Sequence, residues 1–254
     1  MSFDIEEFDA PLEYGKSLPL EEQITISAQG ALAILELLAR RQIPATFFCT
    51  AHFAQQQPAL VRRIAHEGHE VASHGFYHAA FSPEHLKASK DALEAITGKP
   101  VQGFRMARMM PVDADEIAAA GYRYDASLNP TFIPGRYNHF RSPRTPFLQN
   151  NLMELPASVT PFLRIPLFWL AMHNLPFGMY QTLCRVAAKR DKYLNIYFHP
   201  WEFTGLRPKE KFGLPRYITR HSGEELLQRL DRLVVYLKKH AFPFGCLGDC
   251  ERPA

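Results

Sequence analysis

Two histidines are the residues of this sequence whose spacing most directly suggests metal chemistry. His74 and His78 stand four positions apart in the segment SHGFYH. Neutral imidazoles at that spacing can bind one divalent ion from the same face of a helical turn, usually with a carboxylate as third ligand. Because the chain holds 11 His, a surface pair explains this spacing equally well on its own.

The N-terminal segment MSFDIEEFD could supply the carboxylate. Asp4 and Glu6 are two positions apart, and alternate side chains of an extended segment point to the same side. One of the two could bind a metal while the other stands beside the bound water as a base. The alternative is a solvated acidic terminus, which the aromatic residues on both sides of the acids make less attractive because aromatic side chains prefer to be packed.

Single polar residues end three further apolar runs. Arg105 lies in GFRMAR, Asp125 in RYDAS and His199 in NIYFHPWEF. Taken one at a time, their ordinary explanations are a surface ion pair, a turn-capping carboxylate and a hydrogen-bonded structural histidine. All three nevertheless stand at the ends of strand-like segments, where parallel α/β folds gather their functional side chains.

Helices and strands alternate between these residues. Helical periodicity and start and stop residues mark the segments 26–42, 58–68, 82–98, 112–121 and 222–239. Strand patterns mark 43–50, 69–75, 101–105, 122–127 and 191–200. Ser82 is expected to cap the third helix, and Ser222 with Glu225 to form a capping box on the last. The alternation predicts parallel strands with right-handed crossovers, either in a barrel or in a doubly wound sheet.

Composition predicts one α/β domain over residues 1–254. The chain is 46% hydrophobic, which is enough for a substantial core. A net charge of +3 is too balanced to indicate nucleic-acid binding. The charge is unevenly spread, since residues 1–30 hold seven acids and one Lys, whereas 126–153 hold three Arg and no acid. If these segments meet, an acidic pocket has a basic rim.

The sequence also bears on location. The four Cys match no zinc or redox motif, so they are interpreted as reduced thiols. No secretory signal is visible, and we expect a cytoplasmic protein. The most apolar window, residues 161–180, is broken by charged residues and prolines, which argues against a transmembrane segment. Part of it, PFLRIPLFWL, could touch a membrane that carries a lipid-linked precursor, although an apolar element lining the barrel is the simpler interpretation.

Taken in order, the segments SFDIEEF, ATFF, GHEVASHGFYH, GFR, GYRYD and YFHPWEF resemble the polysaccharide deacetylase (NodB homology) superfamily, of the carbohydrate esterase family 4 type. The resemblance is greatest to the branch found in exopolysaccharide and O-antigen clusters. It implies a distorted (β/α)7, TIM-like barrel and a divalent metal, most often zinc. It also implies a hydrolase that removes N-acetyl groups from a sugar or polysaccharide.

The resemblance assigns roles to individual residues. The catalytic base falls on Asp4, the Arg that orients it on Arg105, and the general acid on His199, held by Asp125. The metal-binding histidines fall on His74 and His78.

Two positions depart from the family pattern. Ile5 replaces the usual metal-binding Asp, and since some relatives use the spacing D-x-D, Glu6 becomes the third ligand. Ala107 replaces a Pro after the motif Arg, at a place where a backbone N–H is expected to serve the oxyanion.

The expected substrate is an N-acetylated saccharide. Trp201 could stack on a sugar, and Arg136, in the segment IPGRYNHFRSPRTPF, could meet an anionic group. Two other classes stay open: a hydrolase of the same fold that acts on a small non-sugar amide, and a carbohydrate-binding barrel that lost catalysis with the change at Ile5.

Overall fold

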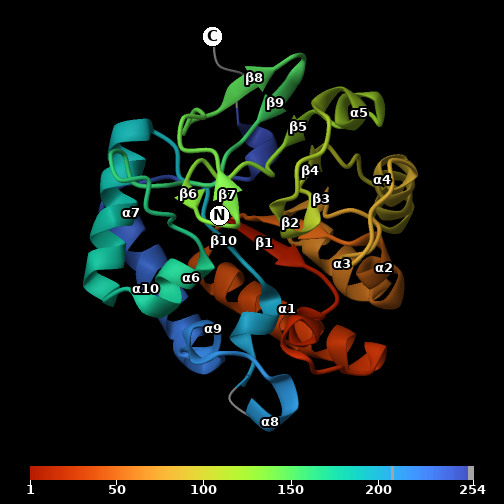
Figure 1. The fold of residues 1–254 in the computed structure, drawn as a ribbon, viewed down its shortest axis with the longest axis horizontal. Coiled ribbons are helices and arrows are strands. Elements are labelled where there is room, and N and C mark those ends of the chain that lie inside the picture. Colours follow the sequence, from red (N-terminus) through yellow and green to blue (C-terminus); the bar gives the residue numbers. More distant parts are fainter. Residues whose placement is uncertain (207–208, 251–254) are drawn as a thin grey trace.

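A curled eight-stranded sheet forms the centre of the protein (Figure 1). The computed structural model describes residues 1–206 and 209–250. The strands follow the order β10-β1-β2-β3-β4-β5-β9-β8, and all neighbours are parallel except β8 and β9. Their bounds are β1 Ser2–Ile5, β2 Thr46–Cys49, β3 Glu70–Ser73, β4 Gly103–Phe104, β5 Tyr124–Asp125, β8 Phe147–Gln149, β9 Leu152–Glu154 and β10 Tyr197–Phe198. The predicted distorted barrel is thereby confirmed.

The central strands are buried on both faces. Every residue of β1 and β2 is buried, as expected for a parallel sheet covered by helices. The rings of Phe3 and Phe47, on neighbouring strands, stack with centroids 5.1 Å apart. This apolar packing fixes the register that carries Asp4 to the end of β1.

Hydrogen bonds around Asn195 join the segment that follows β9 to the segment that precedes β10. The backbone N–H of Ser158, just after β9, donates to the carbonyl of Asn195 at 2.8 Å. The Asn195 amide in turn donates to the carbonyl of Leu155 at 3.3 Å and accepts from the Ser2 hydroxyl at 3.1 Å. Because Asn195 is fully buried, these bonds satisfy groups that would otherwise be costly to bury.

Helices surround the sheet (Figure 1). The α-helices are α1 Leu20–Arg41, α2 Ala51–Gln56, α3 Pro58–His66, α4 Glu84–Thr97, α5 Ala114–Ala119, α6 Trp169–Asn174, α7 Phe177–Asp191, α8 Lys209–Phe212, α9 Arg216–Thr219 and α10 Glu224–Lys239. The 3-10 turns are η1 Ala10–Tyr14, η2 Ala107–Met109, η3 Pro200–Phe203 and η4 Leu247–Asp249. None of the helices in the described part of the chain has the length and apolar character needed to cross a bilayer.

Helix α1 packs tightly against turn η3, which follows β10. A Cβ atom added to Gly30 would lie 1.8 Å from the carbonyl oxygen of Pro200. Only glycine therefore fits at this contact. The contact fixes the turn that carries His199.

Both predicted helix caps are wrong. Pro83 and Gly223 hold the N-cap positions of α4 and α10, and neither makes a side-chain capping bond. Ser222 instead donates to the carbonyl of Thr219 at 3.1 Å. The sequence pattern placed each of these N-caps one residue too early.

Residues 128–168 contain irregular structure that the sequence pattern did not predict. A two-stranded ribbon, β6 Phe132–Ile133 and β7 Tyr137–Asn138, lies apart from the main sheet. Strands β8 and β9 then form an antiparallel edge. Helix α6 lies within the most apolar window of the chain, residues 161–180. These segments are short and lack a clear period, so periodicity could not identify them.

Asp125 and Glu154 form a carboxyl pair at the ends of the adjacent strands β5 and β9. Both are buried. Burial raises the pKa of Asp125 to about 6 despite hydrogen bonds from Ser127 and the Ala126 N–H. Burial, together with the charge of Asp125, also raises the pKa of Glu154 well above its usual range. A raised carboxyl pKa means that the folded state prefers the protonated form.

We expect this pair to make folding stability depend on pH. Both pKa values are higher in the folded than in the unfolded chain, so the pair stabilises the fold at low pH and loses that contribution as the pH rises through about 6. Glu154→Gln should reduce that pH dependence, because the amide cannot titrate. Urea unfolding between acidic and neutral pH measures it. Parallel curves for wild type and variant would contradict the assignment.

Candidate functional site

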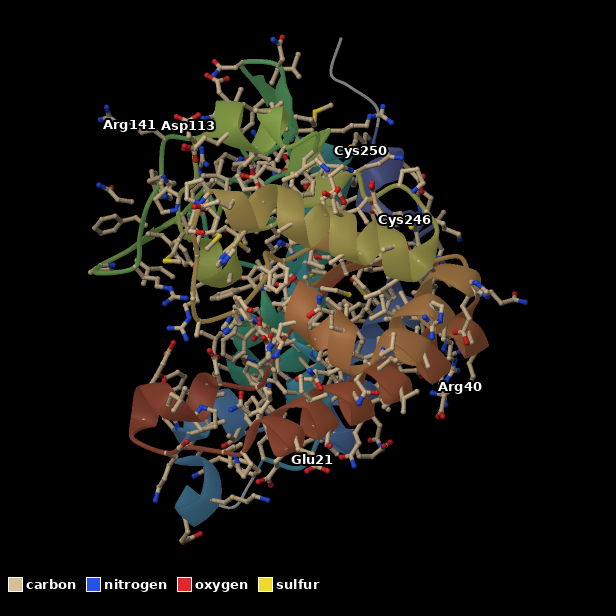
Figure 2. The ribbon with its side chains drawn as sticks, turned by 90° about the vertical axis from the view of Figure 1, so that its right-hand side faces the viewer. Glu21, Arg40, Asp113, Arg141, Cys246 and Cys250 are labelled. Atoms are coloured by element: carbon tan, nitrogen blue, oxygen red, sulfur yellow. The ribbon has the colours of Figure 1, made fainter. Side chains whose placement is uncertain are left out.

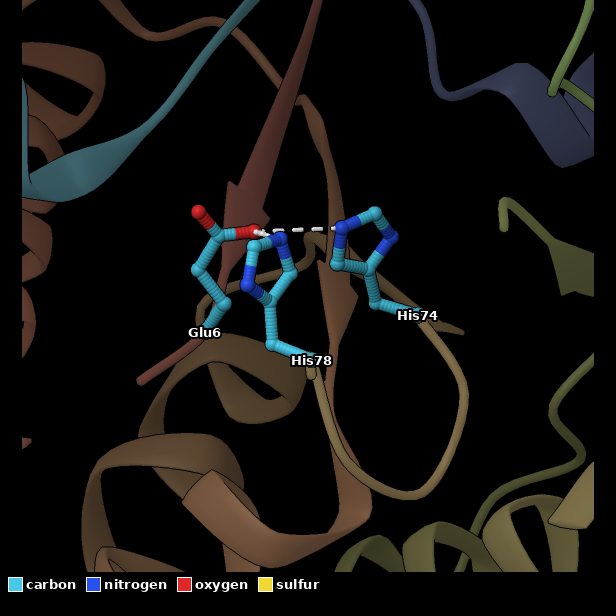
Figure 3. A group of neighbouring side chains, drawn as sticks. All are labelled: Glu6, His74 and His78. Atoms are coloured by element: carbon cyan, nitrogen blue, oxygen red, sulfur yellow. Dashed lines mark ion pairs between the residues drawn. The ribbon is translucent and has the colours of Figure 1, made fainter. Parts of the chain in front are cut away.

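Glu6, His74 and His78 meet at one point at the carboxyl end of the sheet (Figure 3). The Oε2 atom of Glu6 lies 3.2 Å from Nε2 of His74 and 3.1 Å from Nε2 of His78. All three residues are buried, and Glu6 Oε2 has no hydrogen-bond partner. A buried carboxylate oxygen without a partner is costly. A cation bound between the three atoms would satisfy it, and two imidazoles with one carboxylate suit zinc.

Each of the three residues is held by a further contact. His74 Nδ1 lies 2.8 Å from the backbone carbonyl of Arg105, and His78 Nδ1 lies 2.7 Å from Oδ1 of Asp9. Trp201 donates its indole N–H to Oε1 of Glu6 at 3.0 Å. Because the carbonyl and carboxylate accept from Nδ1, both rings turn an Nε2 lone pair toward the shared point.

His78 reaches this point from a loop and not from a helical turn. No helix covers residues 74–78. Gly75 adopts a left-handed conformation with φ of 84°, and its carbonyl accepts from the N–H of Ala51 at 3.0 Å. The spacing of the two histidines therefore identified the correct pair of residues. The two side chains do not, however, lie on one helical turn.

The surroundings of Glu6 favour its charged form. Burial alone would raise the pKa of Glu6, but the neighbouring histidines, His78 foremost, outweigh burial and lower the pKa far below its usual range. Glu6 therefore presents a carboxylate to its neighbours. A carboxylate is the form that a metal ion needs.

Asp4 and Arg105 form a buried ion pair beside this cluster. Arg105 Nη1 donates to Asp4 Oδ1 at 2.6 Å, and both side chains are almost fully buried. Arg105 also donates to the Ser2 hydroxyl at 3.0 Å and to the Ala126 carbonyl at 3.1 Å. The guanidinium lies 4.1 Å from the ring centroid of Phe48. These contacts hold Asp4 in one orientation.

His199 is paired with a carboxylate, but that carboxylate is not Asp125. His199 Nδ1 lies 2.9 Å from Oε1 of Glu202, three residues further along the chain. The other Glu202 oxygen lies 2.9 Å from Nε2 of His173. The predicted role of Asp125 is wrong because its partner is Glu154, as described above.

The electrostatics of this group favour a protonated His199. Burial lowers the pKa of His199, but Glu6, Glu202 and Asp4 together raise it to about 9. Burial opposes the charge of Glu202 in turn, yet hydrogen bonds to His173 and His199 lower its pKa. His199 therefore carries a proton at neutral pH.

A cavity of about 260 Å³ opens onto these groups. Among its lining residues are Asp4, His74, His199, Arg136, Trp169, Trp201, Met109 and Tyr217. Arg136 is exposed at its edge, and its contact with an anionic group stays a prediction. Trp201 is only 3% exposed and its ring packs on His199 and Phe8. Its indole N–H supports Glu6, and its stacking on a sugar stays a prediction.

Sequence reasoning missed three residues of the site. Glu202 follows His199 within HPWEF, and its spacing could have suggested an i, i+3 pair. Asp9 stood among the N-terminal acids, and Arg108, which lies 3.2 Å from it, adopts an unusual φ of 59°. Neither residue carries a pattern of its own, so only the fold could assign them.

Parts of the sequence are similar to known proteins. Residues 26–124 match the family described as polysaccharide deacetylase. The chain is 32% identical over 63 residues to the peptidoglycan-N-acetylmuramic acid deacetylase PdaA of Bacillus subtilis (strain 168), which covers 25% of this chain and 24% of that protein. It is also 43% identical over 49 residues to a chitooligosaccharide deacetylase of Sinorhizobium fredii (strain NBRC 101917 / NGR234). That aligned segment makes up 19% of this chain and 23% of the relative. The matched segments thus span about a quarter of the length of these curated relatives.

The fold is shared more widely than the sequence. The crystal structure of a probable polysaccharide deacetylase from Pseudomonas aeruginosa PAO1 superposes with a TM-score of 0.65 at 14% identity, covering 98% of this chain and 87% of that one. At that identity the likeness concerns the fold alone. The matched segment and the curated relatives thus show that part of this chain is similar to polysaccharide deacetylases, in agreement with its motifs, and the fold is the one seen in such structures.

Proposed function

We propose that this protein is a metal-dependent hydrolase that removes an N-acetyl group from a saccharide. The observation that carries the proposal is the buried, unpartnered Oε2 of Glu6 between two imidazole nitrogens. This cluster lies next to a carboxylate, Asp4, and a protonated imidazole, His199, on one cavity. The motifs of the chain favour a precursor of exopolysaccharide or O-antigen as the saccharide, and cytoplasmic action stays a prediction.

Glu6, His74 and His78 would hold the metal, and zinc is the ion that their donor set fits best. Bound there, zinc would lower the pKa of a water ligand to about 7 and polarise the acetyl carbonyl. The side chains supply the proton transfers. Asp4, oriented by Arg105, is placed to accept the proton of the attacking water.

His199 would complete the reaction from the other side of the cavity. As water oxygen bonds to the acetyl carbon and the C–N bond breaks, the sugar nitrogen needs a proton to leave as an amine. The raised pKa of His199 keeps that proton available near neutral pH. Glu202 holds the ring through Nδ1, so Nε2 is the atom left to donate. The products are acetate and an aminosugar.

The metal site gives the first test. Elemental analysis should find about one zinc ion per chain in wild type and a loss of metal in Glu6→Gln, because two imidazoles alone bind weakly. Glu7→Gln is the matched control: Glu7 is the adjacent buried acid, but it contacts His52 and Thr50 instead. Absence of metal from reconstituted wild type would sink the proposal and favour a carbohydrate-binding barrel.

The base is tested by Asp4→Asn. The amide keeps an oxygen for Arg105 but cannot accept the water proton, so acetate release from N-acetylated chitooligosaccharides should fall about 10² to 10⁴-fold. Metal content should stay at the wild-type level. His74→Ala should lose both metal and activity. Full turnover by Asp4→Asn would remove Asp4 from the base role.

The acid is tested by the pH profile of Glu202→Gln. The carboxylate of Glu202 raises the pKa of His199, so its loss should lower that pKa and move the alkaline limb of kcat to lower pH. His199→Ala should lose that limb altogether and reduce kcat about a hundredfold or more. An unchanged alkaline limb in Glu202→Gln would show that Glu202 supports the fold and not the acid.

A further inference from the structure

Residues 126–190 carry an unusual charge and surface pattern. They hold seven Arg or Lys and a single acid, Glu154, which is buried. The large apolar side chains that they expose include Phe132, Phe140, Phe162 and Leu163. None of these features is needed for the chemistry of the cavity. An exposed group of large apolar side chains usually marks an interaction surface.

The most exposed of these side chains stand at the tip of a rigid turn. Phe162 is 74% and Leu163 76% exposed. The turn is closed by the Thr160 N–H, which donates to the Ile165 carbonyl at 2.9 Å, and by Arg164 in a left-handed conformation with φ of 54°. The sequence interpretation of this stretch as barrel lining is therefore right for Leu167 and wrong for Phe162.

Hydrogen bonds join this turn to the preceding loop. The Arg164 guanidinium donates to the carbonyls of Pro130 at 3.2 Å and Ser142 at 2.7 Å. Thr131 donates to the Arg164 carbonyl at 2.7 Å. The turn thus presents its apolar tip from a fixed scaffold that includes the β6–β7 ribbon.

One exposed cation contacts the apolar tip, and others lie on the neighbouring segments of the chain. The guanidinium of Arg190, in the last turn of α7, lies 4.5 Å from the ring centroid of Phe162. Arg141 projects from the loop at the side of the molecule opposite Cys246 and Cys250 (Figure 2). We define the docking face by its exposed side chains: Phe132, Phe140, Phe162, Leu163, Arg136, Arg141, Lys189 and Arg190.

We propose that the docking face binds the headgroup region of an anionic membrane. Apolar side chains at a tip with cations around them match the requirements of an interfacial site, where the former enter the acyl boundary and the latter meet lipid phosphates. A second copy of the chain fits poorly, because a two-fold interface would oppose the same cations. A soluble anionic polymer would not need the exposed aliphatic side chain of Leu163.

The docking face borders the catalytic cavity. Ile133 and Arg136, from the β6–β7 ribbon, line the cavity that also contains Asp4 and His199. A membrane-docked molecule would therefore present its cavity to the headgroup layer. If the proposed deacetylation is correct, the substrate is an N-acetylated saccharide whose lipid carrier stays in the bilayer.

Vesicle binding tests the docking face without any assay of catalysis. We expect wild type to float with vesicles of equal parts phosphatidylcholine and phosphatidylglycerol at low salt, and to be released at high salt. The F162S/L163S double variant should bind about 30-fold more weakly, and Arg190→Gln about fivefold more weakly. Leu32→Ser, which changes an exposed leucine of α1, is the matched control and should bind as wild type.

Other outcomes would overturn the proposal. Equal vesicle binding by wild type and F162S/L163S would do so. A mass in light scattering that doubles with concentration, and that the double variant restores to a monomer, would identify a second copy as the occupant. Binding to heparin but not to vesicles would identify a soluble polymer. Failure of the metal or acetate assays would leave this result untouched, because the vesicles report binding alone.

The proposed substrate class has its own readout. The double variant should release acetate from soluble chitooligosaccharides at the wild-type rate, because neither side chain lines the cavity. It should lose turnover on an N-acetylglucosaminyl lipid embedded in the same vesicles. Equal turnover of the embedded lipid by both proteins would refute the link between docking and substrate.

Discussion

The buried guanidinium of Arg105 is the group on which the rest of the site depends. A fully buried cation is tolerated only when paired and hydrogen-bonded. Here Asp4 and Ser2 of β1 and the carbonyl of Ala126, just after β5, provide those contacts. The backbone carbonyl of the same residue fixes the ring of His74. One residue therefore ties the proposed base, one proposed metal ligand and the middle of the sheet together.

The N-terminal acids show how such a site is assembled at little cost in buried charge. Glu7 meets His52 and Thr50, while Asp9 meets His78 and Arg108. Glu6 alone keeps a buried oxygen without a partner. Among these acids, the contrast between carboxylates with hydrogen-bond partners and the Oε2 atom of Glu6 distinguishes a ligand position from an ordinary buried ion pair.

Sequence reasoning was sufficient where the chemistry is carried by strand ends. The strands that bear Asp4, His74, Arg105 and His199 could be predicted from apolar runs, and their parallel order brings those ends together. It failed for Asp125, because strand order alone cannot say which of two strand-end carboxylates reaches a given imidazole. It also did not reveal that the Trp201 indole donates to Glu6, because residue spacing does not specify such a side-chain contact. Residues 128–168 could not be predicted, since their short elements follow tertiary contacts and not a period.

The residues of the site fall into two groups that are far apart in the sequence. Asp4, Glu6, the histidine pair and Arg105 all precede residue 106, whereas the proposed proton donor and its carboxylate lie within the four residues from His199 to Glu202. The segment that exposes Phe162 and Leu163 lies between these two groups. A recombination event confined to residues 128–168 would exchange much of the docking face and of the cavity edge, and would leave Lys189, Arg190 and both chemical groups in place. Under the proposed function, the target could thus be inherited separately from the reaction.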